Sequence, residues 1–148
     1  MNVQAADPGF AVVGRLRDAM NVHDLEALVD VFDPDVVSET PAHPQRTFRG
    51  ADQVRRNWEQ IFAGVPDLRA ELLDVVSHGD TVWAEWDWHG TRRDGSPHRM
   101  RGVTILRVKG ARADSVHFYM EPVDVDGVGP DAAVRQIITG SGPAAAVR

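Results

Sequence analysis

Apolar residues in the first half of the chain recur at intervals of three and four positions, which is typical of amphipathic helices. Three such series occur, and proline or glycine follows the second and the third, as expected at helix ends. Between the second and third series, residues 36–40 (Val-Val-Ser-Glu-Thr) predict a short strand that ends at Pro41. The three series are Phe10, Val13, Leu16 and Met20; Leu25, Leu28, Val29 and Phe32; and Val54, Trp58, Ile61 and Phe62.

After residue 67 the pattern changes to runs rich in Val, Trp, Thr and Ile, separated by short turns such as Gly79-Asp80 and Asp94-Gly95. Such runs predict antiparallel strands joined by hairpins. Three helices followed by a strand meander predict a single α+β domain, with the helices on one face of a curved sheet. The strands are expected at residues 68–77, 81–92, 97–108 and 113–121, followed by a short helix at 131–138 and a frayed tail at 139–148.

The segment 82–89, Val-Trp-Ala-Glu-Trp-Asp-Trp-His, is the most unusual part of the chain. A strand sends alternate side chains to opposite faces, so Trp83, Glu85, Asp87 and His89 share one face. If Asp94-Gly95 is a two-residue turn, Glu85 lies opposite Thr104, and this face collects mostly apolar neighbours with a few polar groups. That composition is typical of a ligand cavity, although a three-residue loop or a bulge would reverse the two faces.

Within that cavity, Glu85 and Asp87 would lie about 7 Å apart along the strand. Desolvation and mutual repulsion would raise one pKa and create a general acid beside a general base, with His89 as a proton shuttle. The alternative is a solvated strand face on which the two carboxylates pair with Arg99 and Arg101.

The opposite face carries an aromatic and aliphatic belt rimmed by charges of both signs, which suits a protein–protein interface. We therefore expect a homodimer through the sheet. The belt residues are Trp86, Trp88, Val103, Ile105 and Tyr119.

Composition removes several classes of function. A net charge of −6 argues against nucleic-acid binding, and no apolar run approaches the roughly 20 residues of a membrane span. The chain has no cysteine, and its N-terminus lacks the features of a signal peptide, so we expect a cytoplasmic protein. The six histidines show no metal-binding spacing, and no cofactor fingerprint occurs.

Three groups of residues together resemble the SnoaL-like polyketide cyclases of the nuclear transport factor 2-like, ketosteroid isomerase-like superfamily. They are the run from Asp24 to Val37, the run from Phe48 to Leu68, and Trp86 with Gly90-Thr91 and Tyr119-Met120-Glu121-Pro122. The resemblance spans about residues 10–138 of a single domain, 1–148. It implies a cone-shaped barrel of a strongly curved, mostly antiparallel sheet, with the three N-terminal helices on the concave face around an apolar cavity.

Carried over residue by residue, the resemblance places the cyclases' pocket histidine at Thr104 and the isomerases' base near Thr40. The aspartate of the last strand falls at Phe118. Only Asp87 matches a catalytic carboxylate, from the related epoxide hydrolases.

Two hypotheses follow. The first is a cofactor-free enzyme that uses acid–base catalysis by Asp87, Glu85 and His89 on a small hydrophobic, oxygenated molecule, in an isomerisation, cyclisation or epoxide opening. The second is a non-catalytic ligand-binding or dimerisation module of the same fold. The expected pocket residues are Thr40, His43, Trp58, Phe62, Trp83, Met100, Thr104, Phe118 and Met120.

Overall fold

The structure is a computed structural model that describes residues 7–140. Besides a short 3₁₀ helix at Pro44–Arg46, four α-helices and six strands follow one another in this part of the chain. In chain order they are α1 (Pro8–Val22), α2 (Leu25–Asp30), β1 (Phe32–Glu39), β2 (Phe48–Arg49), α3 (Ala51–Gly64), β3 (Arg69–His78), β4 (Thr81–Thr91), β5 (Pro97–Lys109), β6 (Arg112–Pro122) and α4 (Pro130–Thr139).

Capping interactions at its two ends define where α1 begins and ends. The Asp7 carboxylate accepts hydrogen bonds from the backbone N–H of Gly9 at 2.7 Å and of Phe10 at 3.3 Å, and Pro8 occupies the first helical turn, where its missing N–H costs nothing. The helix ends at His23, whose left-handed backbone (φ 57°) closes the last turn. The expected helix therefore forms, and it buries one apolar face.

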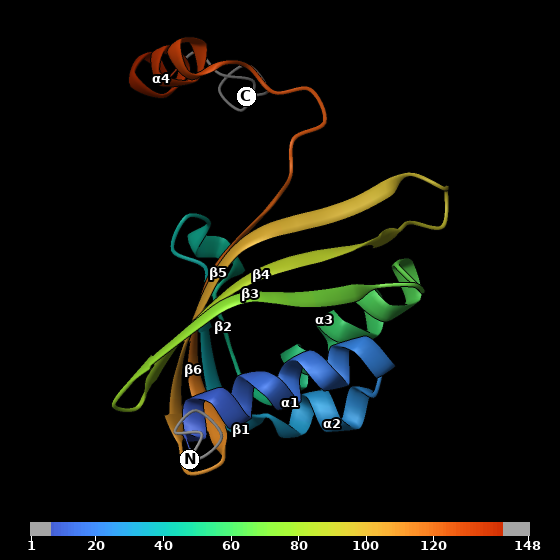
Figure 1. The fold of residues 1–148 in the computed structure, drawn as a ribbon, viewed down its shortest axis with the longest axis vertical. Coiled ribbons are helices and arrows are strands. Elements are labelled where there is room, and N and C mark those ends of the chain that lie inside the picture. Colours follow the sequence, from blue (N-terminus) through green and yellow to red (C-terminus); the bar gives the residue numbers. More distant parts are fainter. Residues whose placement is uncertain (1–6, 141–148) are drawn as a thin grey trace.

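The six strands form one sheet in the order β2-β1-β6-β5-β4-β3, in which only β1 and β6 run parallel. The sheet curves around α1, α2 and α3, which lie together on its concave side (Figure 1). The predicted α+β cone with helices on the concave face is thus confirmed, although the sheet stays open and does not close into a barrel.

The hairpin between β4 and β5 has a different register from the predicted one. Arg92 N–H donates to the carbonyl of Ser96 at 2.8 Å, so three residues form the loop, with Gly95 at φ 87° in the last position. This is the three-residue hairpin in which a left-handed residue follows a tight turn. Ala84, not Glu85, consequently lies opposite Thr104, and the prediction of which face looks inward is wrong.

The β3–β4 hairpin keeps its expected two-residue turn, so Trp83 lies opposite Val76. A bulge at Leu73 then shifts the pairing, and Asp87 lies opposite Glu71 rather than Leu72.

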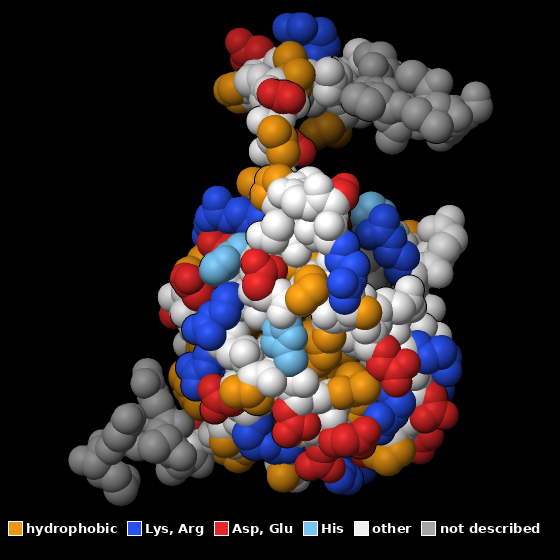
Figure 2. Space-filling model, turned by 90° about the vertical axis from the view of Figure 1, so that its right-hand side faces the viewer, with side chains coloured by type: hydrophobic (Ala, Val, Ile, Leu, Met, Phe, Trp, Pro, Cys, Tyr) orange, Lys and Arg blue, Asp and Glu red, His pale blue; other side chains and the backbone are white. Residues whose placement is uncertain are grey.

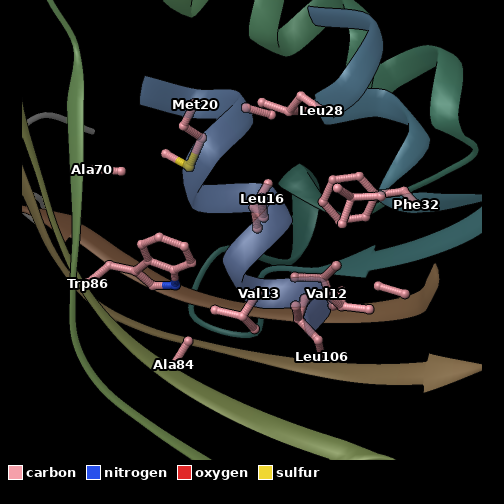
Figure 3. Close-up of a cluster of buried hydrophobic side chains, with 14 of the residues drawn as sticks. Val12, Val13, Leu16, Met20, Leu28, Phe32, Ala70, Ala84, Trp86 and Leu106 are labelled. Atoms are coloured by element: carbon pink, nitrogen blue, oxygen red, sulfur yellow. The ribbon is translucent and has the colours of Figure 1, made fainter. Parts of the chain in front are cut away.

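The main core fills the space between α1 and the concave face of the sheet (Figure 3). Trp86 is fully buried there, facing Met20 and Leu16 of α1. The concave face of β4 therefore consists of Val82, Ala84, Trp86 and Trp88, all buried.

The described residues 7–140 contain no helix long and apolar enough to cross a membrane. The helix expected near the C-terminus is present as α4, and it stands away from the rest of the molecule (Figure 1). The expected frayed tail lies almost entirely outside the described residues.

Candidate functional site

A cavity of about 230 Å³ lies between the concave face of the sheet and the helices. Its walls come from four parts of the chain: α1, the β1–β2 region, α3, and the inner faces of β4, β5 and β6. The lining residues are Leu16, Phe32, Val36, Ser38, Thr40, Arg46, Phe48, Val54, Asn57, Trp58, Ile61, Trp88, Thr104, Leu106, Val116 and Phe118.

The walls are mainly apolar, with a few polar groups between them. Four of those groups are neutral: Ser38, Thr40, Asn57 and Thr104. Among the described residues that form the wall, Arg46 is the single ionisable side chain. An apolar hollow with few polar groups suits a small molecule that is mostly hydrocarbon and carries one or two oxygen atoms.

Thr104 is the best-defined polar group of this wall. Its hydroxyl oxygen accepts a hydrogen bond from the indole Nε1–H of Trp86 at 2.9 Å, and both side chains are buried. A hydroxyl that accepts one bond still has its own hydrogen to donate. Because hydrogen bonds in a chain polarise one another, the Trp86 bond makes the Thr104 hydroxyl a stronger donor.

A second indole on the wall lacks a partner. Trp88 is buried, and its Nε1–H is the single fully buried side-chain N or O atom without a hydrogen-bond partner among residues 7–140. The Trp88 ring packs against the rings of Trp58, Trp86 and Phe118, with centroids 5.5, 6.0 and 5.8 Å apart. An unpaired buried donor of this kind costs about 1–3 kcal/mol.

Two histidine–carboxylate pairs involve neighbours of the lining residues in the sequence, and neither pair belongs to the lining. His43 belongs to the loop between two lining residues, Thr40 and Arg46, and its Nε2 lies 2.7 Å from a carboxylate oxygen of Glu121. A second pair joins His117 and Glu39 at 3.4 Å. Of the sequence candidates, His43 therefore does not line the cavity, and its assignment to the pocket is wrong.

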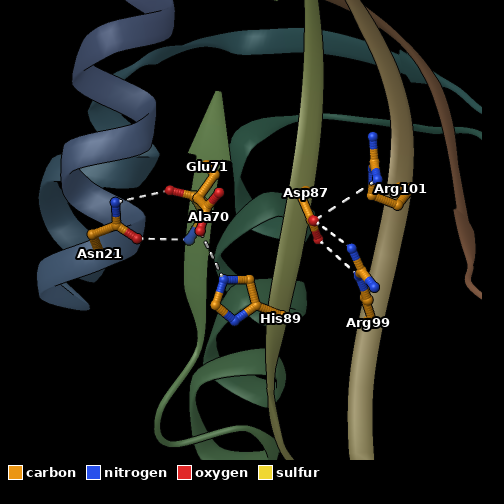
Figure 4. A network of polar contacts seen from close by, with 7 residues as sticks. All are labelled: Asn21, Ala70, Glu71, Asp87, His89, Arg99 and Arg101. Atoms are coloured by element: carbon orange, nitrogen blue, oxygen red, sulfur yellow. Dashed lines mark hydrogen bonds and ion pairs between the residues drawn. The ribbon is translucent and has the colours of Figure 1, made fainter. Parts of the chain in front are cut away.

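Asp87, Glu85 and His89 lie on the convex face, and the prediction that they share the cavity is wrong. Figure 4 shows Asp87 directed from β4 toward Arg99 and Arg101 on β5. Arg99 Nη2 donates to Asp87 at 2.8 Å, and Arg101 lies 4.0 Å from the same oxygen atom. The Arg99 hydrogen bond holds the pKa of Asp87 below its ordinary value, opposite to the raised pKa expected of a cavity acid.

The neighbours of Asp87 are paired in the same way. Glu85 lies 3.8 Å from Arg101, and His89 Nε2 lies 3.3 Å from Glu71. This is the alternative of a solvated, ion-paired strand face. The one-residue register shift in the β4–β5 hairpin is its cause.

The remaining pocket candidates divide into three groups. Thr40, Trp58, Thr104 and Phe118 line the cavity. Phe62, Met100 and Met120 belong to the core or pack against it without lining the cavity, and Phe62 stacks on the His23 ring at 4.5 Å. Trp83 is 52% exposed on the outside of the sheet, so its assignment to the pocket is wrong.

The expected dimer belt also changes. Trp86 and Trp88 point inward and are 0% and 4% exposed, so they are not available to a partner. Val103 and Ile105 are half-buried and Tyr119 is exposed, and these three keep their expected place on the outer face.

The family model described as the SnoaL-like domain matches residues 13–116 of this chain. The chain belongs to the SnoaL-like family. No sequence among curated proteins matches the chain significantly.

Solved structures agree with the SnoaL-like assignment. Wild-type IdmH from Streptomyces antibioticus, assigned to the polyketide cyclases, is 27% identical, with a TM-score of 0.65, over 74% of this chain and 89% of IdmH. A protein of ketosteroid isomerase-like fold from Catenulispora acidiphila is 21% identical, with a TM-score of 0.64, over 73% of this chain and 84% of its own. An NTF2-like protein from Burkholderia pseudomallei is 17% identical, with a TM-score of 0.67, over 78% and 92%. The last two support the fold alone.

In this SnoaL-like chain, sequence reasoning missed Trp88, Asn57, Ser38 and Arg46 as wall residues. Asn57 has a readable signal, since it lies one turn before Ile61 on α3, a helix face already recognised as inward. Trp88 was assigned to the opposite face by the wrong register. Ser38 and Arg46 had no signal in the sequence, because their position depends on how β1 and its following loop cross the cavity.

No group of three or more metal-binding side chains occurs within residues 7–140. The arrangement that remains is chemically simple: an apolar cavity with a polarised hydroxyl on its wall.

Proposed function

We propose that this protein is an enzyme that binds a small, mainly apolar carbonyl compound in the cavity and isomerises it or closes a ring in it. Membership of the SnoaL-like family, whose solved relatives include IdmH, supports chemistry of the cyclase or isomerase type.

One observation carries the proposal: the buried hydrogen bond from Trp86 to the Thr104 hydroxyl on an otherwise apolar wall. When the oxygen of a ligand carbonyl accepts a hydrogen bond from the Thr104 hydroxyl, the carbonyl group withdraws electrons more strongly. A donor already oriented in a dry site stabilises the enolate oxygen that forms when the adjacent carbon loses a proton.

The proton needs a base, and we propose His43 for this role because it belongs to the loop between the lining residues Thr40 and Arg46. Glu121 binds Nε2 of His43, so the carboxylate fixes the ring and leaves Nδ1 able to take a proton. In an isomerisation, this proton leaves the carbon next to the carbonyl, the double bond moves into conjugation, and a proton is returned at the far carbon. No electrons are gained or lost, so the step needs no redox cofactor.

The test uses cyclohex-3-en-1-one, whose conversion to the conjugated isomer is followed by ultraviolet absorbance. We expect Thr104→Val to reduce the rate by about a hundred- to a thousandfold, in line with removal of one oxyanion donor, whereas Thr104→Ser, which keeps the hydroxyl, retains most of the rate. His43→Gln should reduce the rate without preventing binding. Equal rates in Thr104→Val and the wild type would contradict the proposal.

A second candidate function is ligand binding without catalysis. It is favoured by the absence of any carboxylate or imidazole among the described residues that line the cavity. Quenching of Trp58 and Trp88 fluorescence by the ketone, with no conversion above the buffer rate, would identify this alternative.

A further inference from the structure

Arg46 lines the cavity but has no part in the proton transfer proposed for it. The residue follows His43 and Pro44 in a short 3₁₀ turn between β1 and β2, and it is exposed to solvent as well as being part of the wall. A residue that is both exposed and on the wall lies where the cavity opens to solvent. Its guanidinium is therefore available to the part of a ligand that remains at this opening.

The guanidinium of Arg46 is not used within the protein. It carries a positive charge and five N–H donors, yet it forms no hydrogen bond or ion pair with another side chain in the described part of the chain, residues 7–140. Arginines elsewhere pair with carboxylates, as Arg99 does with Asp87 and Arg112 with Asp30. Figure 2 shows the same mixture of basic and acidic side chains over the body of the molecule. Arg46 differs from these arginines because it borders an apolar cavity.

The segment around this arginine is basic although the protein is acidic. Residues 40–50 contain two arginines and one histidine but no aspartate or glutamate, in a chain with a net charge of −6. The nearby carboxylates of Glu39 and Glu121 each lie against a histidine. The positive charge at the cavity opening is thus left without a carboxylate partner from the described residues.

The loop that carries Arg46 is held in place by its own hydrogen bonds. Thr40 N–H donates to the Thr47 hydroxyl at 3.3 Å, which ties the two ends of the loop together. Arg46 N–H donates to the carbonyl of His43 at 2.9 Å, inside the same loop. A charged group on an ordered loop costs less to position when a ligand binds.

Asn57 adds neutral donors to the same wall. Its Oδ1 accepts a hydrogen bond from Gln53 Nε2 at 2.8 Å, and Gln53 in turn accepts one from Arg56 at 2.6 Å. The carbonyl side of the Asn57 amide is therefore occupied, and its two N–H groups remain to donate. The polar groups of the wall thus consist of amide, guanidinium and hydroxyl donors, with no carboxylate among the described lining residues.

A ligand that matches this wall supplies oxygen acceptors and one negative charge. A carboxylate fits the planar fork of a guanidinium, and at the opening it avoids the large cost of burying a charge in the apolar interior. We propose that the substrate is an oxo acid, with its hydrocarbon part in the cavity, its ketone oxygen at Thr104 and its carboxylate on Arg46. The place of the ketone rests on the proposed function, whereas the place of the carboxylate rests on Arg46 and its surroundings.

The test compares two ligands of nearly the same shape by calorimetry at low salt: 4-oxocyclohexane-1-carboxylate and its neutral carboxamide. We expect the wild type to bind the acid about tenfold more tightly, because hydrogen bonds between ionised groups are roughly twice as strong as neutral ones. Arg46→Gln should bind the two ligands equally, with its affinity for the carboxamide unchanged. Arg46→Lys, which keeps the charge, should retain part of the preference.

Arg49→Gln is the matched control. Arg49 belongs to the same basic segment and is exposed, but it does not line the cavity, so this variant loses the same charge and should keep the preference for the acid. Equal affinities in the wild type, a preference that survives in Arg46→Gln, or an equal loss in both glutamine variants would overturn the proposal. Loss of carboxamide binding in Arg46→Gln would also overturn it, because the arginine would then have a structural role.

These measurements report binding and are separate from the test of catalysis. A preference for the acid that depends on Arg46, without any isomerisation of cyclohex-3-en-1-one, would reject the proposed reaction and support the carboxylate site. Isomerisation of the neutral ketone without such a preference would reject the carboxylate site alone.

Discussion

Asp87 illustrates how a single carboxylate is used in this protein. It is 8% exposed on the convex face, yet it stays ionised because Arg99 and Arg101 approach it from the neighbouring strand. A buried charge is tolerated only with such partners. Its role is therefore to tie β4 to β5.

Asp87→Asn should lower the free energy of unfolding by about 1–2 kcal/mol at pH 7 through the loss of charge-assisted hydrogen bonds. The folded pKa of Asp87 is lowered by Arg99, so the stabilisation is present above the unfolded pKa and disappears as the pH falls through the folded pKa. Urea unfolding at a series of pH values from 7 to 3 should thus show the variant and the wild type converging in acid. Glu85→Gln, on an exposed and longer pair, is the near-neutral control, and a pH-independent difference would argue against the ion pair.

At the scale of elements, the β4–β5 hairpin and the neighbouring β6 determine the shape of the cavity wall. Gly102 lies opposite Trp86 on β4 and Met120 on β6, with φ 153°. A Cβ atom built there would lie 2.0 Å from the carbonyl oxygen of Tyr119. The backbones of β5 and β6 therefore approach each other at this point in a way that only glycine permits.

Gly102→Ala should destabilise the fold by about 3 kcal/mol or more, because the contact is with backbone, which cannot move aside as a side chain can. The matched control is Gly64→Ala at the end of α3, where no atom lies within 4 Å of the new Cβ, and where a small gain in stability is expected. Chemical denaturation of the two variants measures the difference. Similar midpoints would show that β5 and β6 can separate without cost.

For the whole molecule, arginine–carboxylate pairs join elements that are distant in the chain. Glu26 of α2 pairs with Arg55 of α3, and Asp30 pairs with Arg112 of β6 at 2.6 Å. The hydrogen bonds from Arg55 and Arg112 lower the pKa values of Glu26 and Asp30, as Arg99 does for Asp87. All three shifts favour the folded state when the carboxylates are ionised.

Stability should consequently fall in acid. Where the folded pKa values lie below the unfolded ones, the unfolded chain binds more protons as the pH drops below about 4, and the unfolding free energy decreases with it. Urea midpoints measured at pH 6 and pH 3.5 should show this loss, and the Asp87→Asn variant should show a smaller one. A midpoint that rises in acid would contradict the prediction.

The sequence by itself determined the order of helices and strands, because spacing, caps and turn residues act locally. The series Phe10 to Met20 became α1, and the motifs around Phe48 and Trp86 were enough to indicate the family. Thr40, Trp58, Thr104 and Phe118 were recognised as pocket residues from these signals, and they line the cavity.

Only the tertiary structure decided which face of β4 looks inward. In the alternating run 82–89, tryptophans occur on both faces and carboxylates on one, so hydrophobicity alone does not distinguish inside from outside. The inward face is determined by a single additional residue in the Arg93–Gly95 loop. This residue shifts the register of β4 against β5 by one position, which exchanges the two faces of β4. Trp88 thereby entered the cavity wall and Asp87 left it, because a strand has a side-chain period of two and its register depends on a contact made across the sheet.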